Sequence, residues 1–422
     1  MPLAGRTGPR PEAAGSLDFS GDTRRFRALP LDGVMSVDGE RSVDGATVDG
    51  VMTGSGAKKS ATTLAFVESP VQLLNVLEWA YTDALRAPGP ETKPADLTVV
   101  VLSPHDPMTR GQLRRMAELA RDEGVTVRWE DARGGAGAPL KTIGGLRGPL
   151  RRAARIVIGD PFSRYVQLLL TLTRAKDLVV VDDGTATMEF ISQLANGERL
   201  ERWHRRGNSR GVLDMAFAPV SATARRRLTP GEKRRVEVFS SMPVEPPPGV
   251  TVTANDFSWT RARFGPPRLT RGTDLVGTSL VETGVVDLER YLEAVAGLAE
   301  AHGATRYFAH RRESAEKLSR VSHEVGLEIV RPDLPLELIA RRGPIGHTIV
   351  SFPSTVVHTL PLALAGTEVK VAVYDVDPAW LTSDASPRAQ GFLSGVTGTA
   401  RDVQRPGAVP STAAPDTPLA MS

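Results

Sequence analysis

Short runs of β-branched and other apolar residues alternate with longer helical segments from residue 62 to residue 373. The runs at 62–67, 97–102 and 177–181 are mostly apolar along their length. A strand with one face exposed to solvent alternates apolar and polar residues, so these runs predict strands that are buried on both faces. Shorter runs at 125–129, 155–159 and 235–239 predict further strands. Strands that are buried on both faces and separated by helices form parallel sheets, so the sequence predicts an α/β protein.

The alternation stops once and then restarts. Residues 242–272 contain two proline clusters, and we predict a linker or long crossover there, because proline interrupts both helices and central strands. Strands are predicted again at 274–280, 304–309, 327–330, 346–351 and 368–373. The prediction is therefore two Rossmann-like domains, at 61–241 and 273–399, facing each other across a cleft at the carboxyl ends of their strands.

The two ends of the chain have a different composition. Residues 1–60 are rich in Gly, Ser and Asp and contain Val-Asp-Gly three times, at 37–39, 43–45 and 48–50. Such a stretch cannot bury enough apolar surface to fold, so it predicts a disordered tail, with Met52 as an alternative start of the native protein. Residues 400–422 predict a second flexible tail.

Composition excludes several classes of protein. The 422 residues include no cysteine, which excludes a disulfide scaffold, a thiolate nucleophile, a zinc ribbon and an iron–sulfur protein. No apolar run reaches the roughly 18 residues that a membrane helix needs, and the first residues have no apolar core of a secretory signal. We therefore expect a soluble cytoplasmic protein.

The net charge of +3 hides a local imbalance. Residues 141–235 hold 19 Lys and Arg against 9 Asp and Glu, an excess of +10, so the other 327 residues sum to −7. One interpretation is a set of solvated helix faces, and the other is a surface that binds a polyanion. Aromatic residues make up only 5% of the chain, which weakens a stacking surface for single-stranded nucleic acid.

Polar residues follow the predicted strands at four places, and the first two lie in the first domain. Ser69 stands where a helix N-cap belongs, with Gln72 one turn further on. Asp182, Asp183 and Gly184 follow the strand at 177–181. Neighbouring side chains on an extended chain point in opposite directions, so one carboxylate can face the cleft while the other anchors the turn. Such a carboxylate can act as a base or can simply cap a helix.

The other two places lie in the second domain. His310 and Arg311 follow the strand at 304–309, and Ser354 and Thr355 follow the strand at 346–351. Guanidinium, imidazole and hydroxyl groups beside open helix amides suit a phosphate, although each stretch also fits an ordinary helix start. The sequence contains no phosphate-binding P-loop, no dinucleotide fingerprint and no metal-ligand spacing.

Together these stretches resemble the bacterial sialyltransferase and polysialyltransferase families. Those families have two Rossmann-like domains in the GT-B arrangement and carry an acidic pair before Gly, a His-Pro and a paired Ser-Ser/Thr in that order. Asp182-Asp183-Gly184 is similar to the first motif and Ser354-Thr355 to the last. The stretches at 68–75 and at 277–284, which begins with Gly277, also resemble family segments. Arg311 stands where the families usually have Pro.

The resemblance implies an inverting, metal-independent glycosyltransferase with no cofactor. It implies a CMP-activated sialic acid, or a related nonulosonic acid such as Kdn, as the donor. By motif position Asp182 resembles the general base, with Asp183 supporting the loop. His310 resembles the residue that contacts the CMP phosphate and protonates the leaving group, beside Arg311 and Gly277. Ser354 and Thr355 resemble the hydroxyl pair that holds the phosphate.

The acceptor implied is a glycan or an acidic polysaccharide. We expect Ser69, Gln72, Gly184, Arg205 and Arg206 on the acceptor side, and we expect no nucleic acid partner. Peripheral association with the inner face of the cell membrane is a further expectation. Two alternatives remain open, namely a non-catalytic polyanion-binding protein that uses residues 141–235, and another GT-B enzyme such as a nucleotide-sugar epimerase.

Overall fold

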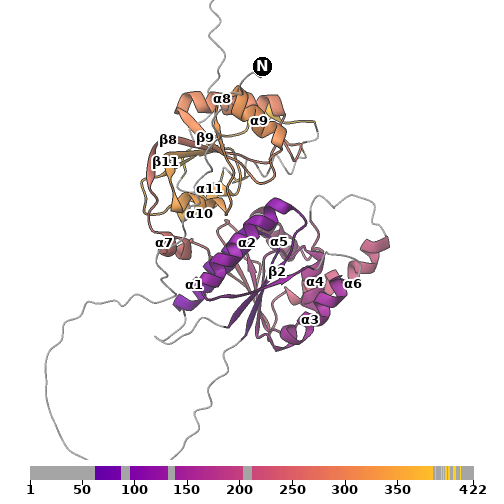
Figure 1. Cartoon of the computed structure of the whole chain (residues 1–422). Coiled ribbons are helices and arrows are strands. Elements are labelled where there is room, and N and C mark those ends of the chain that lie inside the picture. Colours follow the sequence, from indigo (N-terminus) through magenta and orange to yellow (C-terminus); the bar gives the residue numbers. More distant parts are fainter. Residues whose placement is uncertain are drawn as a thin grey trace, which may run out of the picture.

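The chain forms two α/β domains, each built around a parallel sheet (Figure 1). The computed structural model describes residues 62–86, 96–131, 138–202 and 212–383, together with Ala385 and single positions between 391 and 409. The prediction of two Rossmann-like α/β domains with parallel sheets is confirmed. Residues 1–61, for which a disordered tail is predicted up to residue 60, lie outside the described part.

The first sheet has seven strands in the order β3-β2-β1-β4-β5-β6-β7. Its strands are β1 (Thr63–Val67), β2 (Leu97–Leu102), β3 (Thr126–Glu130), β4 (Arg155–Ile158), β5 (Asp177–Val181), β6 (Arg235–Ser240) and β7 (Val250–Ala254). Its helices are α1 (Pro70–Arg86), α2 (Pro107–Asp122), α3 (Ala138–Arg152), α4 (Arg164–Leu172), α5 (Thr185–Ala195) and α6 (Val212–Arg227).

Alternate residues of these strands enter two different cores. Leu64 and Phe66 of β1 pack with α3, α4, α5 and α6, whereas Ala65 and Val67 pack with α1 and α2. This is the period of two that an extended chain imposes, and it explains why the strands are apolar on both faces.

The second sheet has five parallel strands in the order β10-β9-β8-β11-β12. Its strands are β8 (Leu269–Val276), β9 (Ala304–Phe308), β10 (Glu328–Val330), β11 (Ile345–Ser351) and β12 (Lys370–Val373). Its helices are α8 (Leu288–His302), α9 (Ala315–Glu324), α10 (Leu336–Arg342) and α11 (Val356–Ala363).

The prediction of a linker at 242–272 is wrong for most of its length. The strand β7 extends the first sheet, pairing with β6 from Val236 opposite Val250 to Ser240 opposite Ala254. A short helix, α7 (Ser258–Phe264), follows it. The proline cluster ends before β7, and β7 is an edge strand, where a nearby proline does not interrupt a ladder.

The prediction of a flexible tail at 400–422 is wrong at Gln404. Its amide donates to the carbonyl of Val371 at 2.8 Å, and its carbonyl accepts from the amide of Val373 at 2.8 Å. Gln404 therefore forms a bridge beside β12 at the edge of the second sheet.

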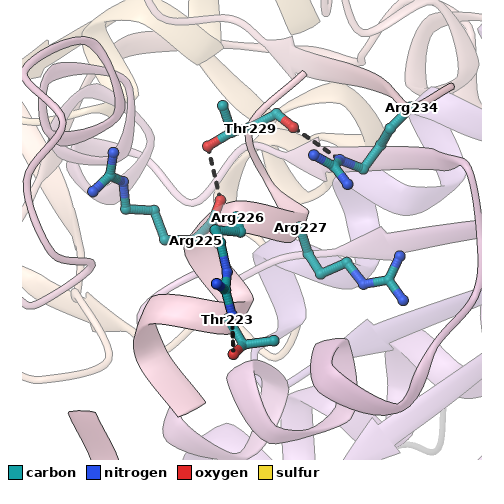
Figure 2. A pocket seen from close by; sticks show the side chains of 6 residues that line it. All are labelled: Thr223, Arg225, Arg226, Arg227, Thr229 and Arg234. Carbon is teal, nitrogen blue, oxygen red and sulfur yellow. Dashed lines mark hydrogen bonds between the residues drawn. The ribbon is translucent and has the colours of Figure 1, made fainter. Parts of the chain in front are cut away.

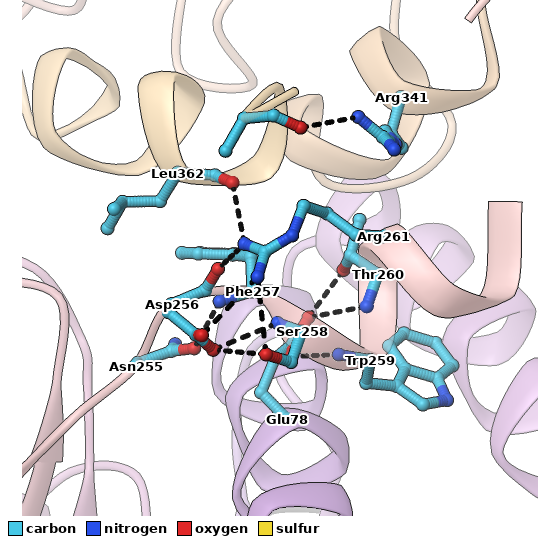
Figure 3. A network of polar contacts seen from close by, with 11 residues as sticks. Glu78, Asn255, Asp256, Phe257, Ser258, Trp259, Thr260, Arg261, Arg341 and Leu362 are labelled. Carbon is cyan, nitrogen blue, oxygen red and sulfur yellow. Dashed lines mark hydrogen bonds and ion pairs between the residues drawn. The ribbon is translucent and has the colours of Figure 1, made fainter. Parts of the chain in front are cut away.

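The helix α7 joins the two domains, and a buried carboxylate holds it in place (Figure 3). Glu78 of α1 is fully buried, and its Oε1 accepts from the amide of Thr260 at 2.9 Å and from its hydroxyl. Its Oε2 accepts from the amide of Trp259 at 2.8 Å. A side chain from another helix thus satisfies the free amides of the first turn of α7. Burial raises the pKa of Glu78 to about 7.

The other side of α7 contacts the second domain. The Nη1 of Arg261 donates to the carbonyl of Leu362 in α11 at 3.0 Å, as Figure 3 shows. Side chains from α10 and α11, among them Leu338 and Ala363, share one apolar cluster with α1, α2 and α7. The two domains are therefore packed against each other through α7.

Removing the Glu78 carboxylate should loosen this junction. We expect Glu78→Ala to lower the free energy of unfolding by about 2–4 kcal/mol, because three buried donors lose their acceptor. The matched control is Glu118→Ala on an exposed position of α2, which should change it by less than about 0.5 kcal/mol. Urea denaturation measures both, and equal midpoints for the two variants would contradict the anchoring role.

Candidate active site

The carboxyl ends of the two sheets bring their following loops together. In the first domain these loops follow β1, β4 and β5, and in the second they follow β8, β9 and β11. A direct contact joins the two sets, because a Cβ added to Gly184 would lie 2.9 Å from Cγ2 of Thr355. The acidic turn of the first domain therefore lies against the Ser-Thr turn of the second.

Asp182 is held inside the first domain. Its Oδ1 accepts from the hydroxyl of Thr187 at 2.7 Å and from the amide of Gly184 at 3.1 Å. Its Oδ2 accepts from the hydroxyl and the amide of Ser241 at 2.8 and 3.1 Å. Burial raises the pKa of Asp182, and these hydrogen bonds oppose that shift. Both oxygens of Asp182 are thus engaged in holding the turn.

Asp183 has different surroundings. Its carboxylate lies 3.8 Å from Arg202, and its electrostatic neighbours include Arg311 of the other domain. Burial and, to a smaller extent, the charge of Asp160 raise the pKa of Asp183 to about 7, although Arg202, Arg311 and a hydrogen bond with Gln72 oppose the rise. A carboxylate with this pKa can accept a proton near neutral pH.

The two carboxylates therefore have surroundings opposite to those that the motif resemblance assigns to them. Asp182, which resembles the general base, anchors the turn. Asp183, for which a supporting role is predicted, lies toward the second domain. The alternation of neighbouring side chains, which the sequence analysis invoked, accounts for the separation of the pair.

Ser69 and Gln72 differ in what they face. The hydroxyl of Ser69 accepts from the amide of Gln72 at 3.3 Å, so Ser69 caps α1. The Oε1 of Gln72 accepts from the amide of Glu68 at 2.8 Å. The side chain of Gln72 passes over Gly159, where an added Cβ would lie 2.4 Å from Cδ of Gln72. Only glycine at this position therefore leaves room for Gln72 to reach Asp183.

Asp160 and Arg202 lie beside Asp183. The sequence did not mark Asp160, and it marked Arg202 only as one of the basic residues of the stretch 141–235. Asp160 follows β4, is 5% exposed, and accepts from Arg202 Nη2 at 2.7 Å and from the amide of Phe162 at 2.8 Å. Its position after a predicted strand is the signal that could have identified it. No local pattern marks Arg202 as a site residue, because it reaches the site across a long separation in sequence.

Arg311 supplies positive charge from the second domain. Burial lowers the pKa of its guanidinium, and the charges of Asp183 and Asp106 raise it. No carboxylate within the described ranges forms an ion pair with Arg311. A half-buried cation without an ion-pair partner, close to a site, is suited to an anionic ligand.

His310 is neutral in this setting. Burial and the charges of Arg311, Arg312 and Lys317 lower the pKa of His310 to about 4. Its Nδ1 accepts from the amide of Arg312 at 3.2 Å, which leaves the proton on Nε2. His310 can therefore donate a hydrogen bond from Nε2 at neutral pH without carrying charge.

A buried ion pair holds the loop that carries His310. The Oε2 of Glu313 accepts from the amide of His310 at 2.6 Å, and its Oε1 accepts from the hydroxyl of Tyr307 at 2.6 Å and lies 2.8 Å from Nζ of Lys317. A Cβ at Gly277 would lie 2.2 Å from Oε2 of Glu313. Gly277 therefore makes room for this carboxylate, and nothing in its contacts places it against a donor.

Two buried hydroxyls of the second domain have no partner among the described residues. They are Oγ of Ser354, after β11, and Oγ1 of Thr278, after β8. A buried polar atom without a hydrogen bond costs free energy, so such atoms are candidates for ligand contacts. Ser354 and Arg311 are thus candidates for contacts with an anionic ligand.

Several predictions concern other parts of the chain. Arg205 and Arg206, predicted on the acceptor side, lie outside the described residues. Where the structure is described, three or more side chains that could share a metal ion do not gather anywhere, and metal independence stays a prediction. No helix in the described ranges is both long and apolar enough to cross a membrane.

The chain matches no known family model and no curated protein. It is similar to the solved α/β-galactoside α-2,3-sialyltransferase of Photobacterium phosphoreum, with 7% identity, a TM-score of 0.43, and 82% of this chain and 99% of that chain covered. It is also similar to a putative UDP-N-acetylglucosamine 2-epimerase of Listeria monocytogenes, with 13% identity, a TM-score of 0.44, and coverage of 80% and 82%. A third similar structure is a heptosyltransferase of E. coli, with 13% identity, a TM-score of 0.36, and 75% of this chain and 90% of that chain covered.

The surroundings of the acidic pair predict opposite effects on stability. The folded protein raises the pKa of Asp183 above its ordinary value of 3.8, so the stability tied to this group is complete below about pH 4 and is lost as pH rises through about 7. We expect Asp183→Asn to be more stable than the wild type at pH 8, by up to about 4 kcal/mol, with a smaller gain at pH 5.

Asp182→Asn provides the comparison. It should be less stable than the wild type by about 2–4 kcal/mol at pH 5, because an amide cannot accept the four hydrogen bonds of the carboxylate. The loss should be smaller at pH 8, because burial also raises the pKa of Asp182. Urea denaturation at the two pH values measures these differences. Effects of the same sign for both variants would contradict the assignment of one anchoring and one cleft-facing carboxylate.

Proposed function

We propose that this protein is an inverting, metal-independent glycosyltransferase of sialyltransferase or polysialyltransferase type. The observation that carries the proposal is that Asp183, with its pKa near 7, lies within electrostatic reach of Arg311 of the other domain, whose guanidinium forms no ion pair with a carboxylate in the described ranges. A base on one side and an anion-binding group on the other are the parts that transfer from a sugar phosphate needs.

Asp183 is the base in this proposal. It takes the proton from the acceptor hydroxyl while the acceptor oxygen forms the new bond to the anomeric carbon of the donor. A positioned base contributes a factor of roughly 10²–10⁴ to the rate. Gln72 and Arg202 contact the carboxylate of Asp183 and lower its pKa. A fraction of the Asp183 side chains is therefore ionised at neutral pH.

The second domain receives the leaving group. As the bond between the anomeric carbon and the phosphate oxygen breaks, negative charge develops on the phosphate, which Arg311 stabilises. The Nε2–H of His310 and the hydroxyls of Ser354 and Thr355 complete the set of donors. With a pKa of about 4, His310 acts as a neutral hydrogen-bond donor in this scheme and not as an imidazolium acid.

The choice of donor and acceptor rests on motif resemblance. The acidic Asp182-Asp183-Gly184 turn and the Ser354-Thr355 pair favour a CMP-activated sialic acid or a related nonulosonic acid such as Kdn. The acceptor in this proposal is a glycan or an acidic polysaccharide, and the reaction takes place in the cytoplasm.

Replacing the base should separate transfer from binding. We expect Asp183→Asn to lower the rate of transfer from CMP-sialic acid by about 10²–10⁴-fold, while the Kd for CMP changes by less than threefold. Product formation and calorimetric binding of CMP measure the two quantities. Asp122→Asn, an exposed position of α2, is the matched control and should retain full activity.

Three results would contradict the proposal. They are full activity of Asp183→Asn, loss of CMP binding in that variant, and turnover of a UDP-sugar in place of CMP-activated acids by the wild-type protein. A changed sugar without an acceptor product would indicate an epimerase.

A further inference from the structure

The amino edge of the first sheet gathers the ends of three helices. The hydroxyl of Thr173, after α4, donates to the carbonyl of Leu150 in α3 at 3.1 Å. Arg227, the last residue of α6, donates to the carbonyl of Thr173. The amide of Arg235, where β6 begins, donates to the carbonyl of Lys176 at 2.8 Å. These contacts place α3, α4, α6 and the starts of β5 and β6 side by side.

This edge carries a surplus of unpaired positive charge. Arg155 and Arg235 have acidic partners, Asp83 and Asp177. Other basic residues at the edge form no ion pair with any carboxylate in the described ranges. We call them the basic edge: Arg147, Arg151, Arg152, Arg174, Lys176, Arg225, Arg226, Arg227, Lys233 and Arg234.

Helix dipoles account for only part of this charge. Basic residues in the last turn of a helix stabilise its C-terminus, which explains Arg151 and Arg152 in α3 and Arg225, Arg226 and Arg227 in α6. Arg174, Lys176 and others of the basic edge lie outside helices, in the segments that lead into β5 and β6. Their positions need another reason.

The shape of the basic edge distinguishes between anionic partners. Figure 2 shows the guanidinium groups of Arg225 and Arg227 pointing in opposite directions from the end of α6. They border a hollow of about 480 Å³, and Arg234 also lines a second hollow of about 540 Å³. No aromatic side chain lines either hollow, so there is no platform for stacking bases. Because these guanidinium groups point apart, they can contact several separate phosphate groups more easily than a single bound anion or a single polyanion chain.

The basic edge is also remote from the candidate active site. The strand β6 runs from Arg235 at this edge to Ser240, next to the Ser241 that binds Asp182. Six residues of strand span roughly 20 Å. The predicted polyanion-binding stretch 141–235 therefore includes residues, Arg225 to Arg235, that lie at the edge opposite to an acceptor bound at Asp183.

We propose that the basic edge docks the protein onto a membrane surface that contains anionic phospholipid. Each Lys or Arg near such a surface strengthens binding about fivefold, and the effect falls with salt. In this orientation the opposite edge, with the loops after β1, β4 and β5, faces away from the lipid. The proposal does not depend on which sugar donor the protein uses.

The test uses full-length protein and sedimentation with vesicles of phosphatidylcholine, alone or with 30% phosphatidylglycerol. The edge variant replaces four exposed residues with Gln: Arg151, Arg152, Arg174 and Arg226. The control variant replaces four exposed arginines of the remainder of the chain with Gln: Arg114, Arg268, Arg271 and Arg342. Both lose four positive charges, and circular dichroism with thermal melting verifies that each is folded.

We expect the wild type to bind anionic vesicles only. Its binding should weaken by at least about tenfold between roughly 50 and 200 mM salt, because salt screens exposed charges. The edge variant should bind on the order of 100-fold more weakly, and the control variant within about threefold of the wild type. Equal binding to neutral vesicles, equal loss in both variants, or no vesicle binding by the wild type would overturn the proposal. So would an edge variant that retains vesicle binding and loses affinity for soluble polysialic acid.

Discussion

The carboxylate of Asp182 is the interaction on which the candidate site depends. It ties together the end of β5, the start of α5 through Thr187, and the segment after β6 through Ser241. Because Asp182 points into the domain, the alternation along the chain turns Asp183 toward the second domain. Gly184, with φ of 63°, then starts α5 while its backbone approaches Thr355 too closely for any side chain. One buried acid thus determines where a second acid lies.

The second domain uses the same device. Glu313 is buried and forms an ion pair with Lys317. It also accepts a hydrogen bond from the amide of His310, which fixes the loop that carries His310 and Arg311. Two buried carboxylates therefore position the two halves of the site, and neither is the group proposed to meet the substrate. Breaking a buried ion pair costs several kcal/mol, so the pair of Glu313 and Lys317 stabilises the position of the loop after β9 when the ligand is absent. Glu78 has a comparable role at the junction between the domains.

The sequence predicted the fold well, because strand positions determine it, and the same positions directed the search for a site to the residues that follow the strands. Polar residues after β1, β5, β9 and β11 were identified without the structure. The roles of Asp182 and Asp183 could not be separated, since a motif of adjacent acids does not say which one the Thr187 and Ser241 hydroxyls will bind. Arg202 belongs to the basic stretch that the sequence identified, but its contacts with Asp160 and Asp183 could not be predicted, because they join residues far apart in sequence.

The misassigned segments have local explanations. The strand β7 follows a proline cluster that is typical of a linker, and pairing with β6 stabilises this strand. The helix α3 contains Gly144, Gly145, Gly148 and Pro149, which individually disfavour a helix, and packing of Leu146 and Leu150 into the core outweighs that preference. Gln404 pairs with β12 through its backbone alone, and no side-chain pattern reports such a contact.

The most direct test of this account is the pKa of Asp183 itself. Aspartate labelled with ¹³C at the side-chain carboxyl allows each Asp to be titrated by NMR without interference from Glu78, whose pKa is also about 7. The account predicts one aspartate signal that titrates near pH 7, disappears in Asp183→Asn, and moves to higher pH in Arg202→Gln. Burial also raises the pKa of Asp182, whose own signal persists in Asp183→Asn. A spectrum in which no signal that titrates near pH 7 is lost on Asp183→Asn would contradict the assignment.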